Sequence, residues 1–203
     1  PTKNILVVSA SKQRADDFST FTLRLIQEME CLRHLTPREN QRNSKIAFDV
    51  GPAPASHAPS VTSKGITSQI TGSRADLIVA DDVESLNNSA TQTMRDKLGE
   101  QIKEFDAVLK PDGHIIYLGT PQTEMSIYAN LPERGYDVRI WPGRVPTKKQ
   151  VGAYGDRLAP VIADRVEDDE GNPTDPDRFN DFDLIEREAS YGKNGFALQF
   201  MLD

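Results

Sequence analysis

The chain alternates short apolar runs with segments in which apolar residues recur at helical spacing. Residues 4–9 form a largely β-branched run without polar alternation, which predicts a strand buried on both faces. In residues 12–32 apolar side chains fall every three or four positions, which predicts an amphipathic helix. Residues 46–48 predict a short strand, and residues 61–70 a further strand or hairpin edge.

The clearest strand prediction covers residues 75–82, where small and aliphatic residues lead directly into two carboxylates. A helix capped by residues 88–89 is expected to extend to about Val108. A turn at residues 111–113 then precedes a strand over residues 114–118. Strands that alternate with helices in this way predict a mostly parallel sheet flanked by helices, an α/β fold.

The pattern is weaker in the last third of the chain. A short helix is predicted over residues 125–131 and a strand over residues 136–141. Residues 142–177 are rich in Gly, Pro and Asp, which predicts a long surface excursion. Two short helices, near residues 182–191 and 194–202, are expected to close the chain.

Length and charge narrow the function classes. A chain of 203 residues fits one domain. Its apolar runs fall far short of the roughly 20 residues needed to cross a bilayer. The lone Cys31 excludes an internal disulfide. The net charge of −7 argues against broad, nonspecific nucleic-acid binding, although basic residues cluster within residues 33–45 and 139–149.

Polar residues follow three of the predicted strands at their carboxyl ends. They occupy residues 9–11, 81–84 and 119–122. Ligands of open parallel sheets bind at this edge, because loops and helix N-termini converge there. If the three strands are neighbours, their polar groups are expected to share one site.

Asp81 ends the most strongly predicted strand, and Asp82 and Glu84 follow it. In nucleotide-hydrolysing enzymes such an aspartate holds the Mg²⁺ that bridges the phosphates, while a nearby carboxylate orients the attacking water. Carboxylates this close repel one another unless a cation neutralises them. The alternative is a capped loop whose acids face water, and the residues alone leave both interpretations open.

Two further positions bear on this chemistry. Gly119 permits a sharp exit from its strand, and the hydroxyl of Thr120 can hydrogen-bond to phosphate or to catalytic water. An ordinary strand-to-loop turn is the alternative. Arg74, just before the acidic strand, is placed to reach the nucleotide of a neighbouring subunit. Its alternative role is a surface ion pair with Asp76.

Five segments, taken in their order along the chain, resemble the large terminase subunit of tailed bacteriophages. They are residues 5–11, 71–84, 94–97, 119–121 and 195–202. The resemblance is greatest to the large terminase subunits of short-tailed, T7-like phages. The resemblance covers nearly the whole chain and implies a RecA-like P-loop NTPase core of the ASCE class. It also implies ATP and Mg²⁺ as cofactors.

The resemblance assigns roles to individual carboxylates. Asp81 would be the Walker B ligand of Mg²⁺. Many relatives place the water-activating acid directly after it, at Asp82, but Glu84 is the longer carboxylate within reach. We favour Glu84 slightly and keep both as candidates.

The other two positions also take roles from the resemblance. Gly119 and Thr120 would contact nucleotide, and Thr120 would couple hydrolysis to movement of the DNA-gripping surface. Arg74 would be a trans-acting arginine finger. The expected partners are double-stranded viral DNA, the portal protein and the small terminase subunit, in a homo-oligomeric ring without a membrane. Such a motor would work in the host cytoplasm, transiently at the procapsid portal.

One departure from the resemblance matters. The chain has no G-x-x-x-x-G-K-[ST] phosphate-binding loop, so alone it is expected to bind triphosphate weakly and to be inactive. In the resembled proteins this loop precedes the first strand and a nuclease domain follows the ATPase. We therefore expect a fragment, with a partial ATPase core over residues 1–141 and an excursion with closing helices over residues 142–203. A helicase-like DNA translocase and a nonenzymatic α/β binding module are the alternative functions.

Overall fold

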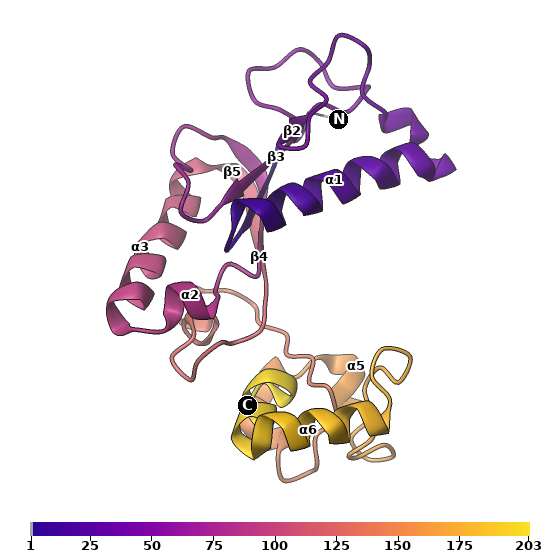
Figure 1. Ribbon diagram of the computed structural model, residues 1–203, viewed down its shortest axis with the longest axis vertical. Helices are drawn as coiled ribbons and strands as arrows, with labels where there is room; N and C mark the ends of the chain where they lie inside the picture. Colours follow the sequence, from indigo (N-terminus) through magenta and orange to yellow (C-terminus); the bar gives the residue numbers. More distant parts are fainter. Residues whose placement is uncertain (1) are drawn as a thin grey trace. The chain divides into compact units, whose positions relative to one another are not determined.

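The computed structural model describes residues 2–203, which form two compact units. The first unit ends at Gly119 and the second begins at Thr120. The first contains a β-sheet and two long helices, and the second is built from helices and turns (Figure 1). The functional boundary predicted after residue 141 falls inside the second unit and stays a prediction.

The first unit is organised by one five-stranded sheet. Its strands lie in the order β2 (Ala47–Phe48), β3 (Val61–Gly65), β1 (Ile5–Ser9), β4 (Ala75–Asp81) and β5 (Leu109–Leu118). β1 pairs in parallel with β3 and with β4, β5 pairs in parallel with β4, and only the short β2 is antiparallel. The predicted α/β fold with a mostly parallel sheet and flanking helices is therefore confirmed.

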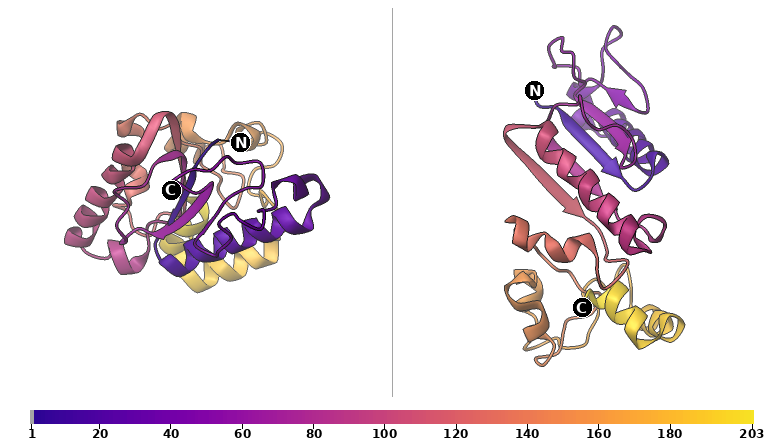
Figure 2. Two further views of the ribbon diagram at one scale, coloured as in Figure 1. Left: turned by 90° about the horizontal axis from the view of Figure 1, so that it is seen from above. Right: turned by 90° about the vertical axis from the view of Figure 1, so that its left-hand side faces the viewer.

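Two long helices lie on opposite sides of this sheet, α1 (Lys12–Glu28) and α3 (Gln92–Val108) (Figures 1 and 2). α1 contacts β1 and β3, whereas α3 contacts β5. Each helix begins at a hydroxyl N-cap, Ser11 for α1 and Thr91 for α3. Both side chains accept a hydrogen bond from the backbone N–H three residues on, which satisfies a donor that the helix cannot pair. The caps therefore fix where each helix starts after the preceding strand or turn.

Four predicted boundaries in this unit are wrong. α1 ends at Glu28 rather than at residue 32, because Met29 has extended backbone angles. The strand alternative for residues 61–70 is confirmed, but β3 already stops at Gly65 and lies between β2 and β1 rather than at an edge of the sheet. Residues 88–89 do not cap the long helix, since they belong to a separate short helix, α2 (Leu86–Ser89). β5 begins at Leu109, so the turn predicted over residues 111–113 lies inside a strand.

The sheet face on the α1 side is covered only in part. Over β1 and β3, the α1 side chains enclose a cluster that contains Val7 and Val61. Val79 and Ile116 share this face with Val7, because they are its register neighbours in β4 and β5. Ile116 is 45% exposed, and Leu118, two residues on, is 49% exposed. We call this part of the face, over β4 and β5, the open face.

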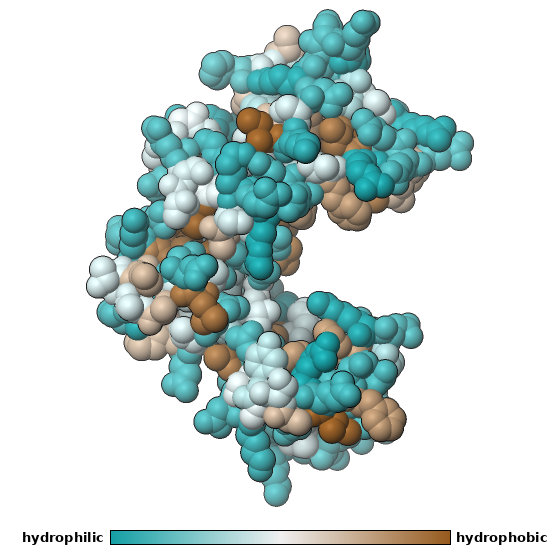
Figure 3. Space-filling view, in the orientation of Figure 1, coloured by the Kyte–Doolittle hydropathy of each residue, from teal (hydrophilic) through white to brown (hydrophobic). Residues whose placement is uncertain are grey.

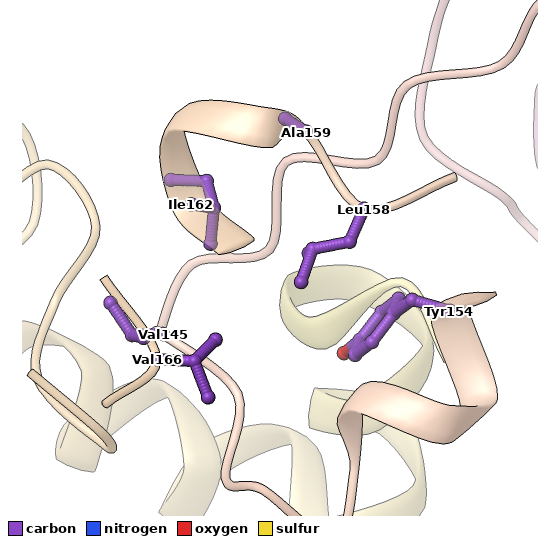
Figure 4. Close-up of a cluster of buried hydrophobic side chains, with 6 residues drawn as sticks. All are labelled: Val145, Tyr154, Leu158, Ala159, Ile162 and Val166. Carbon is purple, nitrogen blue, oxygen red and sulfur yellow. The ribbon is translucent and has the colours of Figure 1, made fainter. Parts of the chain in front are cut away.

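The second unit has a small hydrophobic core of its own. Its elements are η2 (Ile127–Asn130), η3 (Pro132–Arg134), α4 (Val151–Tyr154), η4 (Gly155–Arg157), α5 (Pro160–Ala163), α6 (Asp181–Phe196) and the π-helix η5 (Ala197–Met201). The core residues are Val145, Tyr154, Leu158, Ala159, Ile162 and Val166 (Figure 4). The Tyr154 hydroxyl also donates a hydrogen bond of 2.7 Å to the Met201 carbonyl. Residues 142–177 are therefore not the surface excursion that was predicted.

The strand predicted over residues 136–141 is also wrong. Within it only Ile140 pairs, in a single parallel bridge with Leu158, so no ladder forms. The two predicted closing helices are present, and their separation is confirmed at Gly192, whose φ of 70° interrupts the helical backbone.

The visible surface of the chain is mainly hydrophilic. In Figure 3 hydrophobic residues show as separate patches between larger hydrophilic areas. Within residues 2–203, no helix is both long enough and apolar enough to cross a membrane.

Candidate active site

The carboxyl ends of three parallel strands meet at one edge of the sheet. Ser9 at the end of β1 is the register partner of Asp81 at the end of β4, and Asp81 is the partner of Leu118 at the end of β5. Gly119 follows Leu118 directly. The prediction that these strand ends are neighbours is therefore confirmed. We call this edge, from Ser9 to Gly119, the carboxyl edge.

Asp81 carries a charge that its surroundings disfavour. It is the last residue of β4 and is partly buried. Burial raises the pKa of its carboxyl, the negative charge of Asp82 raises it further, and the positive charge of Arg14 acts in the opposite direction. A divalent cation at this position would stabilise the ionised carboxylate.

The carboxylates of Asp81 and Asp82 suit a cation whose remaining ligands come from phosphate and water rather than from the protein. Among residues 2–203, no group of three or more His, Cys, Asp or Glu residues is placed to hold a metal ion. Mg²⁺ is commonly bound by one or two carboxylates, with phosphate oxygens and water completing its octahedron. Asp81, with Asp82 next to it, fits that mode of binding and not an all-protein cage.

Asp82 turns the chain at this edge through a rare backbone conformation. Its φ is 45°, in the left-handed region, which aspartate tolerates better than most residues. Its N–H donates to the Leu118 carbonyl at 2.8 Å, and its carbonyl accepts from the Ala10 N–H at 3.1 Å. Backbone hydrogen bonds from the ends of β5 and β1 therefore fix the turn at Asp82 on both sides. Backbone strain of this kind is concentrated at functional sites.

The two candidates for the water-activating acid have different environments. The Asp82 side chain is 48% exposed, and its Oδ2 lies 3.7 Å from Nη1 of Arg14. After the left-handed turn the chain enters the core, and Glu84 is only 2% exposed. The interpretation in which all these acids face water therefore fails for Glu84. The predicted roles of Asp82 and Glu84 as candidates for the water-activating acid stay predictions.

The loop after β5 begins beside this turn. Because the Leu118 carbonyl accepts from the Asp82 N–H, Gly119 emerges at the same edge as the two aspartates. Thr120 is the first residue of the second unit, and its carbonyl accepts a hydrogen bond of 3.2 Å from the Gln122 side chain. The predicted roles of Gly119 and Thr120 in nucleotide contact and coupling stay predictions.

Arg74 lies at the opposite end of the same strand. It precedes β4, whose seven residues span about 20 Å, so its position is remote from Asp81 in the same chain. The side chain is exposed, and Nη1 donates to the Ser73 carbonyl at 2.9 Å. An action of Arg74 on a nucleotide would therefore have to occur across subunits.

The alternative prediction for Arg74, an ion pair with Asp76, is wrong. Asp76 accepts from Lys110 Nζ at 2.8 Å, from Lys3 Nζ at 3.4 Å and from the Asn4 N–H at 2.7 Å. These donors lower the pKa of Asp76 to about 2, with the Lys110 hydrogen bond as the largest cause. Sequence proximity was a poor guide, because the partners come from other segments of the chain.

Arg14 is the residue at this edge that sequence reasoning missed. It lies within residues 12–32, for which the sequence predicted only an amphipathic helix. Its place was detectable, since it lies three residues after the N-cap Ser11 and one turn beyond a strand end. First-turn side chains of such a helix lie next to the carboxyl edge of the sheet.

The fold and this edge define an α/β protein in which two adjacent aspartates meet the ends of three parallel strands. The whole chain is 52% identical over 211 aligned residues to the protein named "Terminase, large subunit" of Enterobacteria phage T3. No protein-family model matches the chain. The chain spans about a third of that relative, 36% of its length. The resemblance to large terminase subunits is therefore confirmed.

Proposed function

We propose that this chain is part of the ATP-hydrolysing motor of a large terminase subunit, which drives double-stranded DNA into a viral procapsid. The observation that carries the proposal is the pair Asp81–Asp82 at the meeting point of three parallel strand ends. The similarity to the phage T3 large terminase subunit over the whole chain supports the same assignment.

In this proposal Asp81 holds the cation of Mg²⁺·ATP. Bound Mg²⁺·ATP supplies the phosphoryl group to be transferred and a metal that offsets the charge on the phosphates. Asp81 is suited to this because its ionised form is disfavoured while no cation is bound. The rigid strand β4 keeps the carboxylate in position, and only its last residue enters the site.

A second carboxylate orients the attacking water and accepts its proton. Glu84 fits a base shielded from bulk water, and Asp82 fits one that first has to leave Arg14. General-base catalysis of this kind contributes about 10²–10⁴-fold to the rate. Thr120, two residues beyond the register partner of Asp81, couples this step to the second unit.

The open face indicates where the phosphate-binding loop and the helix that follows it would lie. Parallel sheets are normally covered on both faces, yet Ile116 and Leu118 are about half exposed. A further parallel strand beside β5, joined to β1 by a right-handed crossover, would lay its helix over this face. That helix would begin at the carboxyl edge, where its N-terminal N–H groups can bind phosphate.

Arg74 and the partners belong to the assembled motor. An exposed arginine at the end of β4 remote from Asp81 suits contact with a neighbouring subunit in a ring. The proposed partners are the portal protein, the small terminase subunit and double-stranded DNA. The motor would assemble with them at the procapsid in the host cytoplasm.

ATP turnover by the full-length terminase tests the proposal. Asp81→Asn is expected to lower turnover at least about 100-fold, because the amide loses the charge that holds the metal. Asp76→Asn is the matched control, since it changes the same residue type on the same strand and should keep most of the activity. Wild-type turnover by Asp81→Asn would refute the proposal.

A further inference from the structure

The turn between β1 and α1 lies at the carboxyl edge, next to the turn at Asp82 that directly follows Asp81. Ser9 ends β1 next to Asp81, and the Ala10 N–H donates to the Asp82 carbonyl. Ser11 then starts α1 as its N-cap, and Arg14 lies in the first helical turn. Backbone hydrogen bonds therefore fix this turn relative to both aspartates.

Arg14 forms an ion pair with Asp82, the second of the two adjacent aspartates. Its Nη1 lies 3.7 Å from Oδ2 of Asp82, and its charge also acts on Asp81. The Arg14 side chain is 62% exposed and that of Asp82 48% exposed. An exposed pair at this distance is worth at most about 1 kcal/mol. Arg14 can therefore leave Asp82 at little cost when another anion enters the site.

The Ser9 hydroxyl is an independent sign of a missing ligand. Ser9 is 1% exposed, and its Oγ has no hydrogen-bond partner among residues 2–203. Ser9 and Asp81 are register partners in neighbouring parallel strands, so their side chains lie on the same face of the sheet. Buried hydroxyls are nearly always paired in native proteins. A hydrated cation at Asp81 would supply the partner that Ser9 lacks.

We propose that the β1–α1 turn is part of the nucleotide site, with Arg14 as a phosphate-binding arginine that acts within its own chain. Before nucleotide binds, Arg14 neutralises part of the charge of Asp81 and Asp82. When the metal–nucleotide complex arrives, the cation takes over that role and Arg14 moves to an oxygen of the phosphates. Ser9 hydrogen-bonds to the water shell of the cation. This inference rests on the proposed ATPase function and adds a residue to its site.

Binding of a non-hydrolysable ATP analogue with Mn²⁺ to the full-length terminase tests the inference without catalysis. Arg14→Ala should weaken binding about tenfold, since a charge-assisted hydrogen bond to phosphate is lost. Arg14→Lys should restore part of the affinity, because it keeps the charge but not the forked geometry. The matched control is Arg24→Ala on the same helix, where Arg24 pairs with Glu28, and it should bind like wild type.

Ser9→Ala gives a second readout. It should weaken binding of the same Mn²⁺ complex a few-fold, whereas Ser19→Ala, which removes another buried hydroxyl without a partner, should not. Thermal unfolding without ligand should be nearly unchanged in Arg14→Ala, because the side chain is mostly exposed. Unchanged binding in Arg14→Ala overturns the inference.

ATP turnover separates failure of this inference from failure of the proposed function. If Asp81→Asn is inactive and Arg14→Ala binds and turns over like wild type, the inference is wrong and the ATPase stands. If Asp81→Asn remains active, the proposed function itself is wrong.

Discussion

The two ends of β4 carry the same residue type in opposite electrostatic settings. At the amino end Asp76 accepts hydrogen bonds from two lysines and a backbone N–H, and its pKa falls to about 2. At the carboxyl end Asp81 is partly buried beside a second aspartate, and its pKa is raised. The protein's own groups thus stabilise the ionised form of Asp76, whereas the surroundings of Asp81 disfavour its ionised form.

In the proposed function, this difference separates a carboxylate that stabilises the fold, Asp76, from one that binds a ligand, Asp81. Asp76 joins β4 to Lys110 of β5 and to the segment before β1, so its charge stabilises the sheet. The charge of Asp81 costs stability while no cation is present. Perturbed carboxylates of the second kind are typical of active sites.

The largest expected effect concerns the water-activating acid at the carboxyl edge. Glu84→Gln should lower ATP turnover of the full-length terminase about 100-fold or more while nucleotide binding is kept, since a general base is lost. Asp82→Asn should then cost less than about tenfold. Single-turnover hydrolysis compares the two variants, and the reverse order of effects would assign the role to Asp82.

A smaller loss is expected at the loop after β5. Thr120→Ala should slow hydrolysis about fivefold, or uncouple it from DNA movement, because a single hydroxyl contact is worth about 1 kcal/mol. Nucleotide binding and DNA-stimulated turnover are measured in parallel. Complete loss of nucleotide binding would contradict the coupling role.

Stability should respond in opposite directions at the two ends of β4. Asp76→Asn should lower the free energy of unfolding at pH 7 by about 1–2 kcal/mol, because the wild-type carboxyl has a lowered pKa in the folded state. That advantage of the wild type should be lost as pH falls from 3.8 towards 2. Asp81→Asn should leave the unfolding free energy unchanged or raise it slightly, because the pKa of Asp81 is raised. Urea unfolding of the chain at several pH values checks both signs, and equal losses in the two variants would erase the contrast.

The smallest effect on stability is expected at Arg74. Arg74→Ala should change the unfolding free energy by less than about 0.5 kcal/mol, since the exposed side chain donates only to the neighbouring Ser73 carbonyl. If Arg74 is an arginine finger, Arg74→Ala alone should lower ATP turnover of the full-length terminase, and mixed assemblies then show whether it acts across subunits. Subunits with Arg74→Ala mixed with Asp81→Asn subunits should recover part of the turnover if the arginine acts across subunits, and none if it acts within its own chain.

The sequence predicted the carboxyl edge well because one rule governs it. In a parallel sheet each strand ends at the same edge, so the polar residues after β1, β4 and β5 had to meet if the strands were neighbours. Long-range partners followed no such rule. Lys110 and Lys3 lie 34 and 73 positions from Asp76, and nothing near Asp76 pointed to them rather than to Arg74.

The second unit was harder to predict for a different reason. Its core residues, such as Val145, Tyr154 and Leu158, are separated by polar and loop-forming residues without a helical or strand period. Hydrophobic periodicity identifies elements of ten residues or so, and this unit is mostly built from shorter ones. A core assembled from short turns leaves little pattern in the sequence.

Metal-directed backbone cleavage tests the central claim most directly. With Fe²⁺ and ATP in place of Mg²⁺·ATP, hydroxyl radicals formed at the metal should cut the full-length terminase near residues 9–11, 81–84 and 118–120. Asp81→Asn should abolish these cuts. Cleavage around residues 74–76 instead, or a pattern that Asp81→Asn leaves unchanged, would contradict a metal–nucleotide site at the carboxyl edge.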